Sequence, residues 1–113
     1  MTKNRSAIND GTAPNPVNAE GGVKGSVELI HAVGMHARPA VKLVKLAKRF
    51  QCRIAMRVIG GVDWVDAKSL TKVMATRAAR NSIIEFEASG ADASAAVAAL
   101  VTLVAQDFPD GGH

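Results

Sequence analysis

The pattern of apolar and polar positions predicts a folded region that begins near residue 25. Residues 1–24 are rich in Asn, Gly and Pro and have almost no apolar pattern, which is typical of a disordered tail. Residues 26–32 alternate in part and are rich in aliphatic side chains, which predicts a strand. Residues 37–50 place apolar side chains at helical spacing and basic ones on the opposite side, so we expect an amphipathic helix there.

The rest of the pattern predicts three more strands and two more helices. Residues 52–59 alternate and contain β-branched side chains, and the pair Gly60-Gly61 after them is suited to a tight hairpin turn. The expected elements after the first helix are strands over 52–59 and 62–67, a short helix capped by Ser69 and reaching Ala78, a strand over 81–88, and a last helix from Asp92 or Ser94 to about Asp107.

The order β-α-β-β-α-β-α belongs to the α+β class. An open-faced β-sandwich, with a four-stranded antiparallel sheet and three helices on one face, accounts for it, and we expect one such domain over residues 25–108. Residues 109–113 contain Pro and Gly and are expected to form a flexible C-terminal tail. The same order without the last helix also fits a ferredoxin-like fold, and element order alone does not separate the two.

Composition and charge narrow the classes of function. The chain has 113 residues, of which 48% are hydrophobic and 21% charged, a balance typical of a soluble domain. No apolar run reaches the ~20 residues of a membrane span, and the first ten residues lack a secretory signal, so we expect a cytoplasmic protein without membrane insertion. The net charge of +4 favours an acidic or anionic partner, but three Phe, one Trp and no Tyr argue against nucleic acid.

The single cysteine and the three histidines offer few metal ligands. Cys52 alone cannot form an internal disulfide or a zinc site, and we expect it to be a small core residue. His31 falls in the first predicted strand and His113 ends the chain, so together with His36 they show no metal-ligand spacing. We therefore expect neither a metal nor a cofactor.

The segment over residues 34–40 carries the candidate chemistry. Pro39 is suited to the first turn of a helix, which places His36 at the cap, beside N–H groups that have no helical acceptor. The helix dipole and the guanidinium of Arg38 both favour an anion there. A neutral imidazole beside such an anion cradle is suited to phosphoryl transfer to nitrogen. The residues expected at this helix start are Gly34, which leaves the approach free of a side chain, Ala37 and Pro39.

Physical reasoning leaves other interpretations of these residues open. His36 can simply cap the helix, and Arg38 can be an ordinary surface charge. The basic charge also suits an RNA-binding α+β module, although such modules need aromatic side chains on the sheet. The anion cradle suits a hydrolase of acyl or phosphate groups as well, although no water-activating base accompanies it. On the residues alone, a cap and a phosphoryl acceptor are about equally supported.

The sequence Gly-Met-His-Ala-Arg-Pro-Ala over residues 34–40 closely resembles the active-site signature of the HPr family, the histidine-containing phosphocarriers of the phosphoenolpyruvate-dependent phosphotransferase system. Lys-Ser-Leu at 68–70 resembles the second signature of the family, and the resemblance covers about residues 25–108. It implies the open-faced sandwich rather than the ferredoxin-like fold. It also implies that enzyme I phosphorylates His36 on Nδ1, that Arg38 steadies the phosphoryl group, and that an enzyme IIA receives it.

The same resemblance implies a regulatory role for Ser69, through phosphorylation by an HPr kinase/phosphorylase. Its structural role would be a helix N-cap worth about 1 kcal/mol, and the two roles can coexist. A regulatory HPr-like protein that acts by binding partners is thus an alternative to the phosphocarrier. The Gly-Met-His variant and the ending at residues 106–108 resemble the nitrogen-related branch of the system.

The chain departs from the family pattern in ways that concern the choice of partner. Many members have two glycines after the regulatory serine, where this chain has Arg77 and Asn81, and Val33 replaces a residue that is often polar. Asn tolerates a left-handed backbone, whereas Arg adds a charge near the end of the short helix.

The exposed sides of the first two helices are the expected docking surface for partner proteins. Their basic charge favours fast, weak encounters with acidic surfaces, and we expect a monomeric carrier. The candidate docking residues are Val41, Lys42, Lys45 and Lys48 in the first helix and Leu70, Thr71, Met74 and Arg77 in the second.

Overall fold

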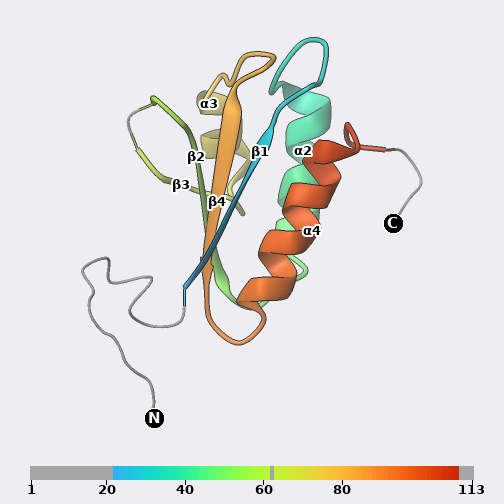
Figure 1. The fold of residues 1–113 in the computed structure, drawn as a ribbon. Helices are drawn as coiled ribbons and strands as arrows, with labels where there is room; N and C mark the ends of the chain where they lie inside the picture. The colour runs from blue at the N-terminus through green and yellow to red at the C-terminus, as the bar shows by residue number, and fades with distance from the viewer. Residues whose placement is uncertain (1–21, 62, 110–113) are drawn as a thin grey trace.

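A computed structural model describes residues 22–61 and 63–109 and shows a four-stranded sheet with three helices on one face (Figure 1). Neighbouring strands are antiparallel, in the order β1-β4-β2-β3. This is the expected open-faced β-sandwich. Its elements are β1 (Val23–Glu28), α2 (Ala37–Ala47), β2 (Arg53–Val58), β3 (Val65–Asp66), α3 (Leu70–Ala75), β4 (Ile83–Ser89) and α4 (Ala93–Ala105).

Strand β4 lies at the centre of the sheet and pairs with the whole of β1 on one side and of β2 on the other. Alternation along β4 directs Ile84, Phe86 and Ala88 toward the helices, where all three are buried. The opposite face of β4 carries Glu85 and Glu87, whose carboxylates pair with basic side chains of the neighbouring strands. One face of the sheet thus builds the core, and the other is charged.

The Ala-rich helix α4 packs closely on β1 and β4. A Cβ on Gly25 of β1 would lie 2.7 Å from Cγ1 of Val97, so the strand and the helix reach this separation only with glycine at that position. Leu100 and Val104 of α4 are fully buried, and each contributes roughly 1.5–3 kcal/mol through the burial of its apolar surface.

Helix α2 packs between α3 and α4 (Figure 1). It ends at Ala47 rather than at the expected Phe50, because the N–H groups of Arg49 and Phe50 bond to carbonyls three residues back, which tightens the chain out of α-helical geometry. Its buried residues, spaced three or four apart as the sequence pattern predicts, are Pro39, Ala40, Leu43, Val44 and Ala47.

The first strand begins and ends earlier than the sequence pattern predicts, over 23–28 instead of 26–32. After Glu28 the chain leaves the sheet, because Leu29 bonds through both backbone groups to Ser82 and Asn81 in the turn before β4. Residues 23 and 24, expected in the N-terminal tail, are paired in β1. Nearly all the rest of that predicted tail lies outside the described residues, as does the C-terminal tail beyond Pro109.

The third strand is shorter than the predicted 62–67, because only Val65 and Asp66 pair with β2. After Asp66 one more bond to β2 remains, from the N–H of Ala67 to the C=O of Ile54 at 3.0 Å, while the C=O of Asp66 accepts the N–H of Ser69 and its carboxylate accepts the N–H of Lys68 at 2.9 Å. These bonds turn the chain into α3, so that β3 is a short edge strand.

Asp92 is the N-cap residue of α4, but its side chain does not cap the helix. Its carboxylate accepts the N–H groups of Gln51 and Cys52, both at 3.2 Å, and so joins the start of α4 to the start of β2. Desolvation alone would raise the pKa of Asp92, but hydrogen bonds, with that from Gln51 the strongest, hold the pKa below its usual value. Burial raises the pKa of the Cys52 thiol, as suits the expected core residue.

Helix α3 ends at Ala75, three residues before the predicted end at Ala78. Arg77 has φ 50° and cannot continue the helix. Asn81 has φ 75°, and its Nδ2 donates to Oε2 of Glu28 at 2.8 Å. Both residues stand where the family resemblance points to glycine, so the backbone keeps a glycine-like turn, with a side chain at Arg77 that disfavours it.

Replacing Arg77 by glycine should raise the free energy of unfolding by about 0.5–1 kcal/mol, because glycine adopts a positive φ without steric strain. Arg80→Gly is the matched control, since Arg80 is not among the described residues with positive φ, and it should lower stability by about 0.5–1 kcal/mol. Urea unfolding of the three proteins measures both effects. Equal destabilisation by the two substitutions would contradict strain at Arg77.

Candidate functional site

His36 occupies the N-cap position of α2, as the sequence predicts. Its backbone is extended, with φ −131° and ψ −165°, and its C=O accepts the N–H of Ala40 at 3.0 Å. Its side chain makes no capping hydrogen bond. The imidazole therefore does not serve as a helix cap, which was the open alternative, and it is available for another role.

The two ring nitrogens of His36 differ in their surroundings. Nε2 is buried and has no hydrogen-bond partner. Nδ1 is not among the buried unpartnered atoms, and no hydrogen bond occupies it within the described residues. An electrophile from solvent can therefore reach Nδ1 but not Nε2.

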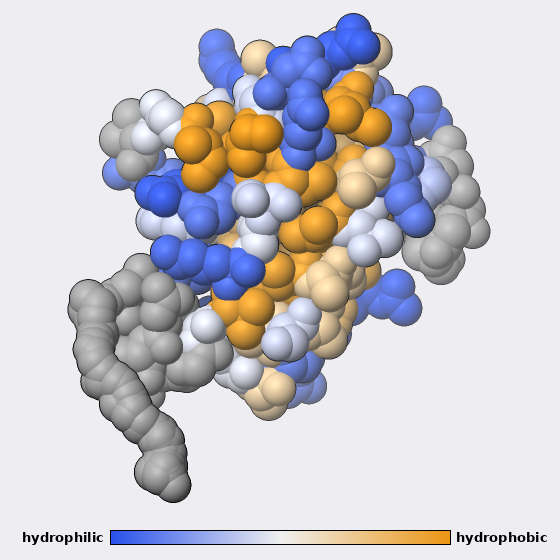
Figure 2. All heavy atoms as spheres, viewed as in Figure 1, coloured by the Kyte–Doolittle hydropathy of each residue, from blue (hydrophilic) through white to orange (hydrophobic). Residues whose placement is uncertain are grey.

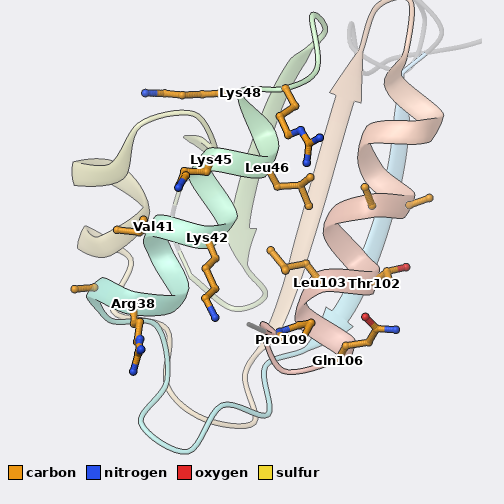
Figure 3. A pocket seen from close by; sticks show the side chains of 14 residues that line it. Arg38, Val41, Lys42, Lys45, Leu46, Lys48, Thr102, Leu103, Gln106 and Pro109 are labelled. Atoms are coloured by element: carbon orange, nitrogen blue, oxygen red, sulfur yellow. The ribbon is translucent and has the colours of Figure 1, made fainter. Parts of the chain in front are cut away.

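The first turn of α2 forms an electropositive end beside this ring. The N–H groups of Ala37 and Arg38 have no carbonyl acceptor one turn earlier, since the first helical bond is donated by the N–H of Ala40 to His36, and Pro39 has no N–H to satisfy. No acidic residue lies in this turn. The Arg38 side chain is exposed and extends from the start of the helix (Figure 3). An anion is favoured at this end of α2 by the dipole, the free donors and the guanidinium.

Gly34 has a packing role that the sequence pattern did not predict. It has φ 73°, and a Cβ there would lie 2.5 Å from the carbonyl oxygen of Ala78. The next residue, Met35, donates its N–H to that same oxygen at 2.8 Å and buries its side chain. Glycine is thus required because the loop before α2 packs directly on the loop before β4.

His31 lies close to the site, although the sequence pattern places it in the first strand. Because β1 ends at Glu28, His31 belongs to the loop that leads to α2. Its ring centroid is 5.1 Å from that of His36, and its Nδ1 is 3.8 Å from Oδ1 of Asp107, beyond α4. The available sequence signal was the break in alternation at Leu29-Ile30, which marks the end of the strand.

The predicted docking residues are exposed, with one exception. Lys42 is half-buried, and its Nζ donates to the C=O of Phe108 at 2.8 Å, which ties α2 to the segment after α4. Large apolar side chains are open to solvent at Val41 (39%), Leu70 (39%) and Met74 (37%) on the packed pair α2 and α3. The other exposed members of the predicted set are Lys45, Lys48, Thr71 and Arg77.

A groove of about 1190 Å³ runs between α2 and α4. Leu46 of α2 and Leu103 of α4 point toward each other across it (Figure 3). On the face that presents α4, apolar surface lies between hydrophilic side chains (Figure 2). Every charged side chain in the lining is basic, and these residues are Arg38, Lys42, Lys45, Lys48 and Arg49.

Other kinds of site find little support in the part of the chain that the structure describes. Over residues 22–61 and 63–109, no cluster of His, Cys, Asp or Glu is arranged to hold a metal ion, and no helix has the length and apolar character needed to cross a membrane. The open sheet face carries Glu85 and Glu87, and Trp64 stacks with the Arg57 guanidinium 4.6 Å from the ring centroid. Such a face lacks the row of exposed rings that RNA-binding sheets use.

Comparison with known proteins identifies the family. The model of the PTS HPr component phosphorylation site matches residues 23–106. The chain belongs to the HPr family. The phosphocarrier protein NPr of Escherichia coli is 34% identical over 88 residues, which cover 78% of this chain and 97% of that protein. The phosphocarrier protein HPr of Cupriavidus necator is 37% identical over 83 residues, which cover 74% of this chain and 91% of that protein.

A solved structure of HPr from Thermoanaerobacter tengcongensis has the same fold, with a TM-score of 0.71 and 29% identity over 76% of this chain and 94% of that one. This similarity confirms the HPr-like sandwich. As a member of the HPr family, the chain is a phosphocarrier protein of the phosphotransferase system, and it works with phosphoryl-transfer partners of that system. Its relatives include proteins named HPr and proteins named NPr.

Ser69 caps α3 as predicted, since its Oγ accepts the N–H of Lys72 at 3.3 Å. Ser69→Ala should therefore lower the free energy of unfolding by about 1 kcal/mol and leave phosphorylation of the carrier intact. Ser26→Ala, at an exposed position of β1, is the matched control and should change stability by less than about 0.5 kcal/mol. Thermal unfolding and phosphorylation measured on the same samples test both statements, and an unchanged melting temperature in Ser69→Ala would contradict the cap.

Proposed function

We propose that His36 accepts a phosphoryl group on Nδ1 from enzyme I and passes it to an enzyme IIA, and that Arg38 steadies the group in both transfers. One observation carries this proposal: the ring of His36 stands at the start of α2 with no capping bond, with Nε2 buried and with Nδ1 open to solvent. The carrier acts as a monomer in the cytoplasm, with no metal or cofactor of its own.

The geometry suits a transfer between nitrogen atoms. The lone pair of Nδ1 attacks the phosphorus of a phosphohistidine on enzyme I, the new N–P bond forms as the old one breaks, and the electron pair of the old bond stays on the donor nitrogen. The N–H groups at the start of α2 and the guanidinium of Arg38 offset the negative charge that passes between the rings. The N–P bond is labile, so the same chemistry delivers the group to enzyme IIA, and His36 works as a relay.

Phosphorylation by enzyme I and phosphoenolpyruvate tests this assignment. The wild-type chain should form an acid-labile, base-stable phosphoprotein, and His36→Ala should not, because it lacks the accepting nitrogen. His113→Ala is the matched control and should label like the wild type. Full labelling of His36→Ala would refute the proposal. Offering the labelled chain to sugar-specific and nitrogen-related IIA proteins in parallel then identifies its acceptor.

The proposed docking surface lies on α2 and α3 beside His36. Three large apolar side chains are exposed on it, those of Val41, Leu70 and Met74. Grouped apolar side chains of this kind mark a surface that binds a partner. Exposed Lys45 and Lys48 add positive charge on α2. A partner with an acidic rim around an apolar centre fits this surface, and the charges accelerate its approach.

Reversal of one charge on this surface should slow the approach of the partner. We expect Lys45→Glu to reduce the rate of phosphoryl transfer from enzyme I by about tenfold at low salt, and by much less near 0.5 M salt, because salt screens exposed charges. Arg53→Glu, at an exposed position of β2 whose neighbour Ile54 faces the core, is the control and should have little effect. Stopped-flow rates at several salt concentrations measure the difference, and equal effects of the two reversals would count against docking on α2.

Ser69 is the proposed regulatory site, modified by an HPr kinase/phosphorylase. It is half-buried at the start of α3, directly before exposed Leu70 of the docking surface. A phosphate there would bring about two negative charges to the edge of an otherwise basic and apolar surface, and would weaken the binding of acidic partners while favouring others. Regulation by partner binding and phosphoryl transfer at His36 would then be two uses of the same surface.

A further inference from the structure

His31 and His36 form a pair of imidazole rings at the start of α2. Their centroids are 5.1 Å apart and their planes are inclined by 54°. His31 lies in the loop before the helix, and its C=O accepts the N–H of Gly34 at 2.9 Å, which fixes the turn that carries it. The second histidine is therefore held beside the phosphoryl acceptor by the backbone of the same loop.

The segment after α4 holds His31 from the other side. Asp107 and Phe108 both have positive φ, 59° and 53°, and so turn the chain back toward the loop. The Phe108 ring is buried, with its centroid 6.0 Å from that of His31. Oδ1 of Asp107 lies 3.8 Å from Nδ1 of His31. Since the Phe108 C=O accepts the bond from Lys42, this segment is anchored to α2 as well.

Two buried nitrogen atoms in this pair have no hydrogen-bond partner, Nδ1 of His31 and Nε2 of His36. Unpartnered polar atoms are uncommon inside proteins and call for a functional explanation. A small cavity of about 180 Å³ adjoins His31, and its lining includes Asp107, Arg38 and Lys42. The charged groups that face His31 are thus one carboxylate after α4, two cations of α2 and the ring of His36.

We propose that His31 is a positioning residue for the phosphocarrier. When His36 takes up a phosphoryl group, the pair of rings takes up one proton from water, and Asp107 holds that proton on His31. The proposal rests on the phosphorylation of His36 proposed above. The incoming group carries about two negative charges, and negative charge beside an imidazole favours its protonated form. The resulting imidazolium offsets the phosphoryl charge and, through its contact with the neighbouring ring, holds His36 in place.

Proton uptake makes the transfer depend on pH in a definite direction. The phosphorylated carrier binds one more proton than the unphosphorylated carrier, so a fall in pH favours the phosphorylated form. The effect reaches up to tenfold per pH unit, in the pH range between the titration midpoint of the two histidines in the unphosphorylated carrier and that in the phosphorylated carrier. The equilibrium with enzyme I then moves toward the carrier in acid and toward enzyme I in base.

An NMR titration of the histidine rings in the full chain tests the proposal without enzyme I. Phosphoramidate, a small-molecule phosphoryl donor, can load His36 directly. The titration midpoint of His31 should rise by about one pH unit in the loaded protein, and should not move in His36→Ala treated in the same way. An unchanged midpoint of His31 in protein shown to carry the group on His36 overturns the proposal, whether or not enzyme I uses this chain.

Variants give a second measurement. Between pH 6 and 8, the equilibrium constant for transfer from enzyme I should change about fivefold more in the wild type than in His31→Asn, and Asp107→Asn should reduce this excess. Asp63→Asn, an exposed aspartate before β3, is the control and should behave like the wild type. Superimposable pH profiles for the wild type and His31→Asn would refute the role of His31. If enzyme I transfers no phosphoryl group but the midpoint of His31 still rises in the loaded protein, only the assignment of enzyme I as donor is refuted.

Discussion

The position of His36 depends on one backbone contact, the hydrogen bond from the N–H of Met35 to the C=O of Ala78. The bond forms because Gly34 allows the two loops to touch, and a side chain at that position would overlap the same oxygen. The contact joins the loop before α2 to the turn that follows α3. His36 and helix α3 are thus held in one corner of the fold by this bond.

A second anchor comes from the far end of the chain. Left-handed backbone at Asp107 and Phe108 turns the segment after α4 toward the start of α2, and Lys42 holds it there. This anchor brings a carboxylate to the second histidine and gives the site a charged group of each sign. It also uses Lys42 internally, whereas Lys45 and Lys48 farther along α2 are exposed.

The site contains few functional groups, because a phosphocarrier performs only a transfer. A phosphocarrier must hold a phosphoryl group long enough to meet its acceptor and must release it without loss to water. In the proposed relay, the free N–H groups at the start of α2 and the guanidinium of Arg38 offset the phosphoryl charge. Within the described residues no carboxylate is hydrogen-bonded to His36, so the site has no base there to activate a water molecule. Under the proposed function, charge complementarity between the carrier and its partners would control the rate of encounter rather than the chemistry.

The sequence by itself determined the order of elements, the start of α2 at His36, the cap at Ser69 and the core faces of α2 and β4, because periodicity and capping are local properties. Its strand ends were wrong where distant groups intervene, as at Leu29, whose backbone partners lie beyond α3. Only the tertiary structure decided the reason for Gly34, the internal bond of Lys42 and the place of His31. Each depends on a contact between segments far apart in the chain, and no local pattern records such a contact.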